Sequence, residues 1–163
     1  KDFILAESQV DFYAQCVSRA GEDNLSRITL LLLAHRLGSR LPALLDYIHS
    51  LGMLALVETR APGDLSCLDA SSLPALIGIN NKNIDLLEKD EDSLKVTPPM
   101  IAAYRRVIGG RLIISESALR SPQDAWHAMR AGADAVLVGT AFMVSPDPGR
   151  TVASFVHASE GLV

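Results

Sequence analysis

The sequence has 163 residues, enough for one domain with a sizeable hydrophobic core. Apolar residues make up 48% and aromatic residues 5%, so aliphatic side chains must fill most of that core. The formal net charge is −4 and no basic cluster exceeds two or three residues, which argues against a nucleic-acid-binding protein. No apolar stretch reaches the ~20 residues that span a bilayer, and the start of the sequence lacks the apolar core of a signal peptide. We therefore expect a cytosolic protein without a membrane partner.

Cysteine and histidine usage gives no sign of a disulfide framework or a metal site. Cys16 and Cys67 show no CxxC spacing, and we expect buried or half-buried thiols in a reducing compartment. The histidines lack metal-ligand spacing, and His35 is expected at the end of a strand.

Short apolar runs alternate along the chain with longer amphipathic segments. The apolar runs predict strands at 3–5, 27–35, 54–57, 76–79, 112–114 and 135–138. The amphipathic segments predict helices at 8–19, 42–50, 100–108, 122–131 and 147–158, with a short helical piece near 65–70. Ser121 is expected to cap the fourth of these helices, with Pro122 at its first position.

Strands separated by helices of this length imply right-handed crossovers and a parallel sheet. No linker divides the sequence, so we expect residues 1–163 to form a single domain of about six β/α units. Two architectures fit this pattern: an open doubly wound sheet, or a (β/α)₈ barrel of the TIM type seen from its third unit onward. Periodicity does not decide between them.

Polar residues directly follow the predicted strands, where parallel α/β folds bind their ligands. These residues are Glu58, Asn80, Lys82, Glu116, Ser117, Gly139 and Thr140. Carboxylates, an amide and a lysine at one edge of a sheet suit acid–base chemistry. The alternative for each residue is helix capping or loop solvation.

The last two strand ends favour phosphate binding. Ser115-Glu116-Ser117-Ala118 and Val138-Gly139-Thr140-Ala141 offer small residues whose backbone N–H groups can approach an anion. Barrel enzymes often hold phosphate in the loops after their last two strands. A tight strand-to-helix turn is the alternative for either loop alone.

The order and spacing of the strand-end motifs resemble indole-3-glycerol phosphate synthase. The resemblance runs from that family's third strand to its last helix, and it favours the partial barrel over the open sheet. It rests on Lys1-Asp2-Phe3-Ile4, Leu56-Val57-Glu58, Gly78-Ile79-Asn80-Asn81, Ser115-Glu116-Ser117 and Ala131-Gly132-Ala133-Asp134-Ala135-Val136-Leu137-Val138-Gly139-Thr140.

The resemblance implies a lyase of tryptophan biosynthesis that works without metal or cofactor. Its substrate would be 1-(2-carboxyphenylamino)-1-deoxyribulose 5-phosphate, which closes to an indole with loss of CO₂ and water. By position, Lys1 would be the general acid of ring closure and Glu58 would transfer protons in the dehydration. Asn80 would orient hydroxyls and Glu116 would organise the lysine charge. The substrate-binding residues would be Phe3, which flanks the anthranilate ring, together with Lys82, Ser117, Gly139 and Thr140.

The chain also departs from the family pattern. The family usually has Asn-Asn-Arg-Asp-Leu after its sixth strand, whereas Lys82 and Asn83 here replace the arginine and the aspartate. Ala118 stands where the family usually has glycine, which would cost about 1 kcal/mol if the backbone there needs a positive φ.

These departures leave two rival functions open: a catalytically impaired phosphosugar-binding or scaffold relative, and another phosphate-barrel enzyme such as a phosphosugar isomerase. The family's first two strands, with a further catalytic lysine and glutamate, have no counterpart in the sequence. The exposed edges of an unclosed barrel would then be covered by an N-terminal segment or by a second copy in a homodimer.

Overall fold

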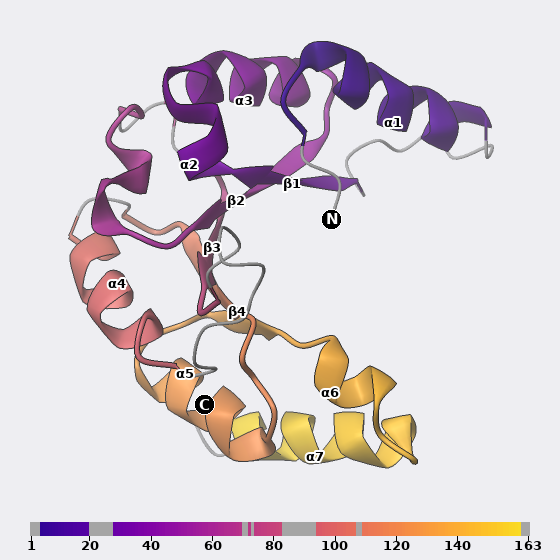
Figure 1. Ribbon diagram of the computed structural model, residues 1–163, viewed down its shortest axis with the longest axis vertical. Helices are drawn as coiled ribbons and strands as arrows, with labels where there is room; N and C mark the ends of the chain where they lie inside the picture. The colour runs from indigo at the N-terminus through magenta and orange to yellow at the C-terminus, as the bar shows by residue number, and fades with distance from the viewer. Residues whose placement is uncertain are drawn as a thin grey trace. The chain divides into compact units, whose positions relative to one another are not determined.

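The computed structural model describes residues 4–19, 28–69, 72, 74–82, 94–106 and 109–160. The chain divides into two compact units, Lys1–Ile77 and Gly78–Val163. Figure 1 shows the fold and labels α1–α7 and β1–β4. The elements are α1 (Glu7–Arg19), β1 (Thr29–Leu33), α2 (Ala34–Leu37), the 3₁₀ helix η2 (Gly38–Arg40), α3 (Leu41–Ser50), β2 (Leu54–Thr59), the 3₁₀ helix η3 (Pro62–Leu65), β3 (Leu76–Asn80), α4 (Thr97–Tyr104), β4 (Leu112–Glu116), α5 (Pro122–Arg130), β5 (Ala135–Leu137), α6 (Thr140–Met143) and α7 (Pro148–Glu160).

The described strands form a sheet in the order β1-β2-β3-β4-β5, so neighbours in the sequence are neighbours in the sheet. The pairs β1–β2 and β4–β5 are parallel, as the strand–helix alternation predicts. Among the described residues, no helix has the length and apolar character needed to cross a membrane.

The predicted strand at 3–5 is wrong where the structure describes it, because Ile4 and Leu5 lie outside any strand. The backbone N–H groups of Leu5 and Ala6 donate to the Gln9 side chain, at 2.7 and 3.2 Å. These N–H groups are therefore bonded to a side chain in the first turn of α1 and not to a neighbouring strand. The thiol of Cys16 on α1 is exposed, contrary to expectation, whereas Cys67 is half-buried as expected.

In the first unit, β1 and β2 pair in register from Thr29 opposite Leu54 to Leu33 opposite Glu58. The predicted strand at 27–35 is too long, because α2 begins at Ala34 and contains His35. Its apolar run ends at Ala34, which is already the first residue of α2, so the end of the run does not mark the change from strand to helix. The helical piece expected near 65–70 is instead η3, which ends at Leu65.

A hydrogen bond links α1 to α3, because the Tyr47 hydroxyl donates to Asp11 Oδ1 at 2.5 Å. This bond, followed by desolvation and the negative charges of Asp11 and Glu7, raises the pKa of Tyr47 above its ordinary value near 10. The stabilisation is complete below the unfolded-state pKa and is lost as the pH rises through the raised folded-state pKa. We therefore expect unfolding titrations between about pH 9 and 12 to show a loss of stability that Tyr47→Phe reduces. An identical pH profile for the two proteins would contradict this assignment.

In the second unit, β4 and β5 pair in parallel, with Glu116 opposite Leu137. The N-terminus of α5 is as predicted: Ser121 Oγ accepts from Asp124 N at 3.3 Å, Asp124 Oδ2 accepts from Ser121 N at 2.8 Å, and Pro122 occupies the first turn. The helix α7 packs against α5 and α6, and the rings of Phe142 and Phe155 meet edge to face with centroids 5.1 Å apart.

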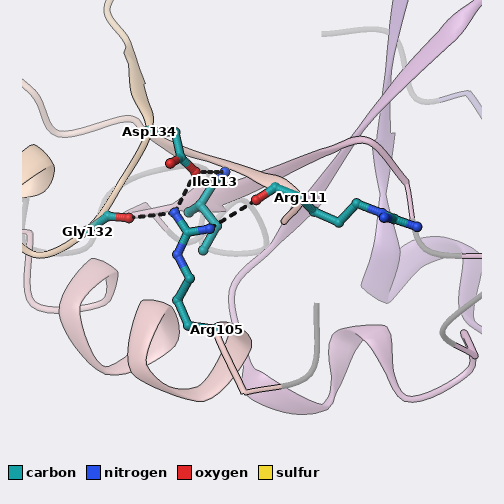
Figure 2. A network of polar contacts seen from close by, with 5 residues as sticks. All are labelled: Arg105, Arg111, Ile113, Gly132 and Asp134. Atoms are coloured by element: carbon teal, nitrogen blue, oxygen red, sulfur yellow. Dashed lines mark hydrogen bonds and ion pairs between the residues drawn. The ribbon is translucent and has the colours of Figure 1, made fainter. Parts of the chain in front are cut away.

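Arg105 ties together the segments that enter β4 and β5 (Figure 2). Its guanidinium bonds Asp134 Oδ2 at 2.6 Å, Gly132 O at 2.9 Å and Arg111 O at 3.0 Å. Asp134 Oδ2 also accepts from Ile113 N at 2.7 Å. The Ala-Gly-Ala-Asp run therefore fastens the amino ends of these strands, away from their carboxyl ends.

The same run contains a glycine that the backbone requires. Gly132 has φ +104°, and a Cβ there would lie 3.2 Å from Ile101 Cγ2. We expect Gly132→Ala to lower the free energy of unfolding by about 1–2 kcal/mol, measured by chemical denaturation. Gly63→Ala is the control, since an added Cβ there meets nothing within 4 Å. Equal effects of the two changes would contradict the prediction.

Candidate active site

Three of the predicted catalytic side chains lie at the carboxyl ends of strands and are buried. Asn80 is the last residue of β3, Glu116 is the last residue of β4, and Glu58 is the penultimate residue of β2. Their exposed fractions are 1%, 3% and 3%. The strands run one or two residues further than predicted, so these side chains are held by sheet backbone instead of by loops.

The second unit contains most of the predicted site. Because β4 and β5 are parallel and Glu116 is opposite Leu137, the loops that begin at Ser117 and at Val138 leave the same edge. Gly139 and Thr140 are exposed in the second loop, and Ser117 is half-buried in the first. Lys82 is half-buried after β3, where its N–H donates to Asn80 Oδ1 at 2.8 Å.

The turn after β4 has the backbone conformation that the family's glycine would suit. Ser117 has φ 64° and Ala118 has φ 57°, and the Ala118 side chain is buried. The left-handed region costs an L residue roughly 1–2 kcal/mol. The positive φ of Ala118 meets the condition under which this departure from the family pattern was expected to carry a cost.

Ala118→Gly should therefore cost the protein little or no stability. Relief of about 1–2 kcal/mol of backbone strain offsets the ~0.4–1 kcal/mol that glycine loses through its freedom in the unfolded chain and the ~0.8 kcal/mol lost with one buried methyl group. We expect the free energy of unfolding to change by less than about 1 kcal/mol. Ala128→Gly, within α5, is the matched control because its methyl group is also buried, and with no strain to relieve it should destabilise by about 1–2 kcal/mol. Equal losses of stability from the two changes would refute the strain.

A buried polar ring adjoins this turn, formed by Asn81, Ser115 and Thr97. Asn81 Nδ2 donates to Ser115 Oγ at 3.1 Å, and Thr97 Oγ1 donates to Asn81 Oδ1 at 2.9 Å. The two hydroxyl oxygens lie 2.8 Å apart. Since the Thr97 proton goes to Asn81, the Ser115 hydroxyl must donate to Thr97, and the three bonds run in one direction around the ring.

The sequence did not predict this ring. Asn81 and Ser115 lie within the motifs that carried the family resemblance, yet neither was expected to have a role of its own. Thr97 lies 16 residues beyond Asn81 and carried no motif. Its one local sign is its place immediately before Pro98-Pro99, at the start of α4.

Glu58 belongs to the first unit, Lys1–Ile77. The loop that follows it is held by Asp64, whose Oδ2 accepts from Arg60 N at 2.7 Å and from Ala61 N at 2.9 Å. These bonds fix the path of the chain directly after the end of β2.

Lys1 and Phe3 lie outside the described residues, as does Asn83. The structure therefore describes part of the predicted site, in two separate units. Across the described ranges, no group of three or more His, Cys, Asp or Glu side chains could hold a metal ion.

Solved structures with low sequence identity share the fold. The structure described as native KDPGal is 15% identical with a TM-score of 0.63, covering 97% of this chain and 66% of that one. A 3-hexulose-6-phosphate synthase is 14% identical with a TM-score of 0.60, covering 90% of this chain and 67% of that one. The parallel strands with polar carboxyl ends, together with this likeness, define an α/β protein of the TIM-barrel type. The chain forms part of such a barrel.

The chain belongs to the indole-3-glycerol phosphate synthase family, whose family model matches residues 1–155. The synthase of Rippkaea orientalis is 40% identical over 128 residues, covering 77% of this chain and 43% of that protein. That of Parafrankia sp. is 38% identical over 160 residues, covering 97% of this chain and 53% of that protein. That of Pyrococcus furiosus is 30% identical over 158 residues, covering 97% of this chain and 63% of that protein. The chain thus spans about half the length of the curated relatives it matches.

Proposed function

We propose that the natural protein is a lyase of tryptophan biosynthesis. It converts 1-(2-carboxyphenylamino)-1-deoxyribulose 5-phosphate to indole-3-glycerol phosphate, with loss of CO₂ and water. The observation that carries this proposal is the match of residues 1–155 to the family, with Glu58, Asn80 and Glu116 buried at strand ends. We further propose that it acts in the cytosol and uses no metal or cofactor.

The proposed roles follow the order of the reaction. Lys1 protonates the carbonyl oxygen during ring closure, while Phe3 flanks the anthranilate ring. Glu58 then transfers protons as the hydroxyl leaves as water, and Asn80 orients that hydroxyl. Glu116 keeps the lysine charged, because a nearby carboxylate favours the protonated amine.

The phosphate is proposed to bind at the edge where β4 and β5 end. Ser117, Gly139 and Thr140 offer small side chains and backbone donors there, and the parallel register of β4 and β5 supports their proximity. Lys82 adds a positive charge after β3, though a lysine cannot form the two-pronged contact of the family's arginine.

The test is a direct assay of indole-3-glycerol phosphate formation by the protein at its natural length, with phosphate titrated by calorimetry in parallel. Product formation supports the lyase. Phosphate binding without product supports the impaired phosphosugar-binding relative, which Ala118, Lys82 and Asn83 motivate. Isomerisation of a phosphosugar without indole formation would support the other barrel enzyme.

We also propose that a further segment of the natural polypeptide covers the apolar surface of β5, α6 and α7. Met143 is 84% exposed and Val144 is 74% exposed, and Leu137 on the edge strand β5 is 52% exposed. The relatives' greater length supports this occupant over a second copy. Peroxide oxidation of Met143 should be slow in the natural-length protein when light scattering shows a monomer. A dimer in which Met143 is protected would instead favour the second copy, and rapid oxidation would refute both.

A further inference from the structure

We infer that Thr97 and Ser115 are positioning residues for the phosphate subsite, acting through the amide of Asn81 on the turn after β4. This inference rests on the proposed phosphate-binding role of that turn. It concerns side chains that the family resemblance left without a role.

The first step is the direction of two peptide groups. Asn81 Nδ2 lies 2.9 Å from Glu116 O and 3.3 Å from Ser117 O, and Asn81 N also donates to Glu116 O at 2.9 Å. Both carbonyls therefore point toward Asn81. In a planar trans peptide the N–H is antiparallel to the C=O, and the described chain has no cis peptide bond. The N–H groups of Ser117 and Ala118 must then point away from Asn81.

Two successive N–H groups directed to the same side suit an anion. Strand alternation places the Glu116 side chain on the face of β4 opposite to Ser115, which faces Thr97 of α4. The polar ring of Asn81, Ser115 and Thr97 thus lies on the side of β4 that faces α4. The N–H groups of Ser117 and Ala118 are directed away from Asn81.

The second step is the orientation of the Asn81 amide. An amide that is flipped by 180° would present Oδ1 to the carbonyls of Glu116 and Ser117, which is repulsive. This repulsion selects the observed orientation, because the hydroxyls of Thr97 and Ser115 can each donate or accept and would pair with either one. In the observed orientation Oδ1 accepts from Thr97 and Nδ2 donates to Ser115. Thr97 and Asn81 are 0% and 1% exposed, so water does not substitute for these partners at little cost. Removing the Thr97 hydroxyl should leave the buried Oδ1 without this donor, which favours displacement of the amide and, with it, of the two peptide groups.

The test compares Thr97→Val with Thr97→Ser in the natural-length protein. Valine keeps the shape and loses the donor, whereas serine keeps the donor. We expect Thr97→Val to weaken the binding of inorganic phosphate about tenfold, the effect of about one hydrogen bond. Anthranilate inhibition should change less than twofold in both variants, and Thr97→Ser should bind phosphate as the parent does. Phosphate should shift the amide NMR signals of Ser117 and Ala118 in the parent and less in Thr97→Val.

Arg105→Ala is the control for a purely structural effect, because it loosens the amino ends of β4 and β5 without contacting the ring. Equal loss of phosphate affinity in Arg105→Ala and Thr97→Val, or loss of phosphate and anthranilate binding together, would overturn the inference. So would a parent protein that binds no phosphate. A parent protein that binds phosphate but forms no indole-3-glycerol phosphate would refute the proposed lyase activity. The phosphate measurements on the variants would still decide the positioning role.

Discussion

Glu58→Gln is expected to lower kcat/KM for indole-3-glycerol phosphate formation by about 10²–10⁴-fold, the range for loss of a general acid–base group. Glutamine nearly matches the buried carboxylate in shape but can neither take up nor deliver the proton of the dehydration step. Lys1→Met should cause a loss of the same order in ring closure. The measurement is steady-state kinetics on the natural-length protein.

Glu7→Gln provides the control, since it makes the same chemical change at an exposed position on α1 and should leave kcat/KM within about twofold. The folded fraction of each variant is checked by its denaturation midpoint. Unchanged activity in both Glu58→Gln and Lys1→Met would refute the assigned roles.

Asn81→Ala is expected to lower the free energy of unfolding by about 3 kcal/mol, because it leaves the buried hydroxyls of Ser115 and Thr97 without their amide partner at roughly 1–3 kcal/mol each. Urea denaturation measures the loss. The triple change Asn81→Leu, Thr97→Val and Ser115→Ala should regain much of it, since an all-apolar cluster leaves no orphaned hydroxyl. A single variant that loses less than about 1 kcal/mol, or a triple variant as unstable as the single, would contradict this account.

Features set by short stretches of sequence were predictable. Ser121 and Pro122 mark the start of α5 because capping needs only a local side chain and a fixed φ. The apolar runs predicted that Glu58, Asn80 and Glu116 follow strands, and the three residues lie within the last two positions of β2, β3 and β4, which run one or two residues further than predicted. The cost at Ala118 was predicted on the condition of a positive φ, because the family usually has glycine there, and the φ of 57° meets that condition.

Features set by contacts between distant residues were not predictable. The Asn81 ring joins residues up to 34 apart, and nothing in the sequence around Thr97 indicates its partners. The start of α2 at Ala34 was missed because the apolar run of the strand includes this first helical residue. The four-residue helix α6 was missed because it is too short to show a periodicity.

The Arg105–Asp134 cluster has a bearing on how this family could acquire new specificities. It fastens the amino ends of β4 and β5 through a guanidinium, a carboxylate and backbone carbonyls, while the proposed phosphate-binding residues Ser117, Gly139 and Thr140 follow the carboxyl ends of the same strands. Changes in the loops that follow β4 and β5 therefore leave the Arg105–Asp134 contacts intact, so the substrate specificity can vary without loss of folding stability. A library randomised at Gly139 and Thr140 should consequently contain more folded members than one randomised at Gly132 and Asp134.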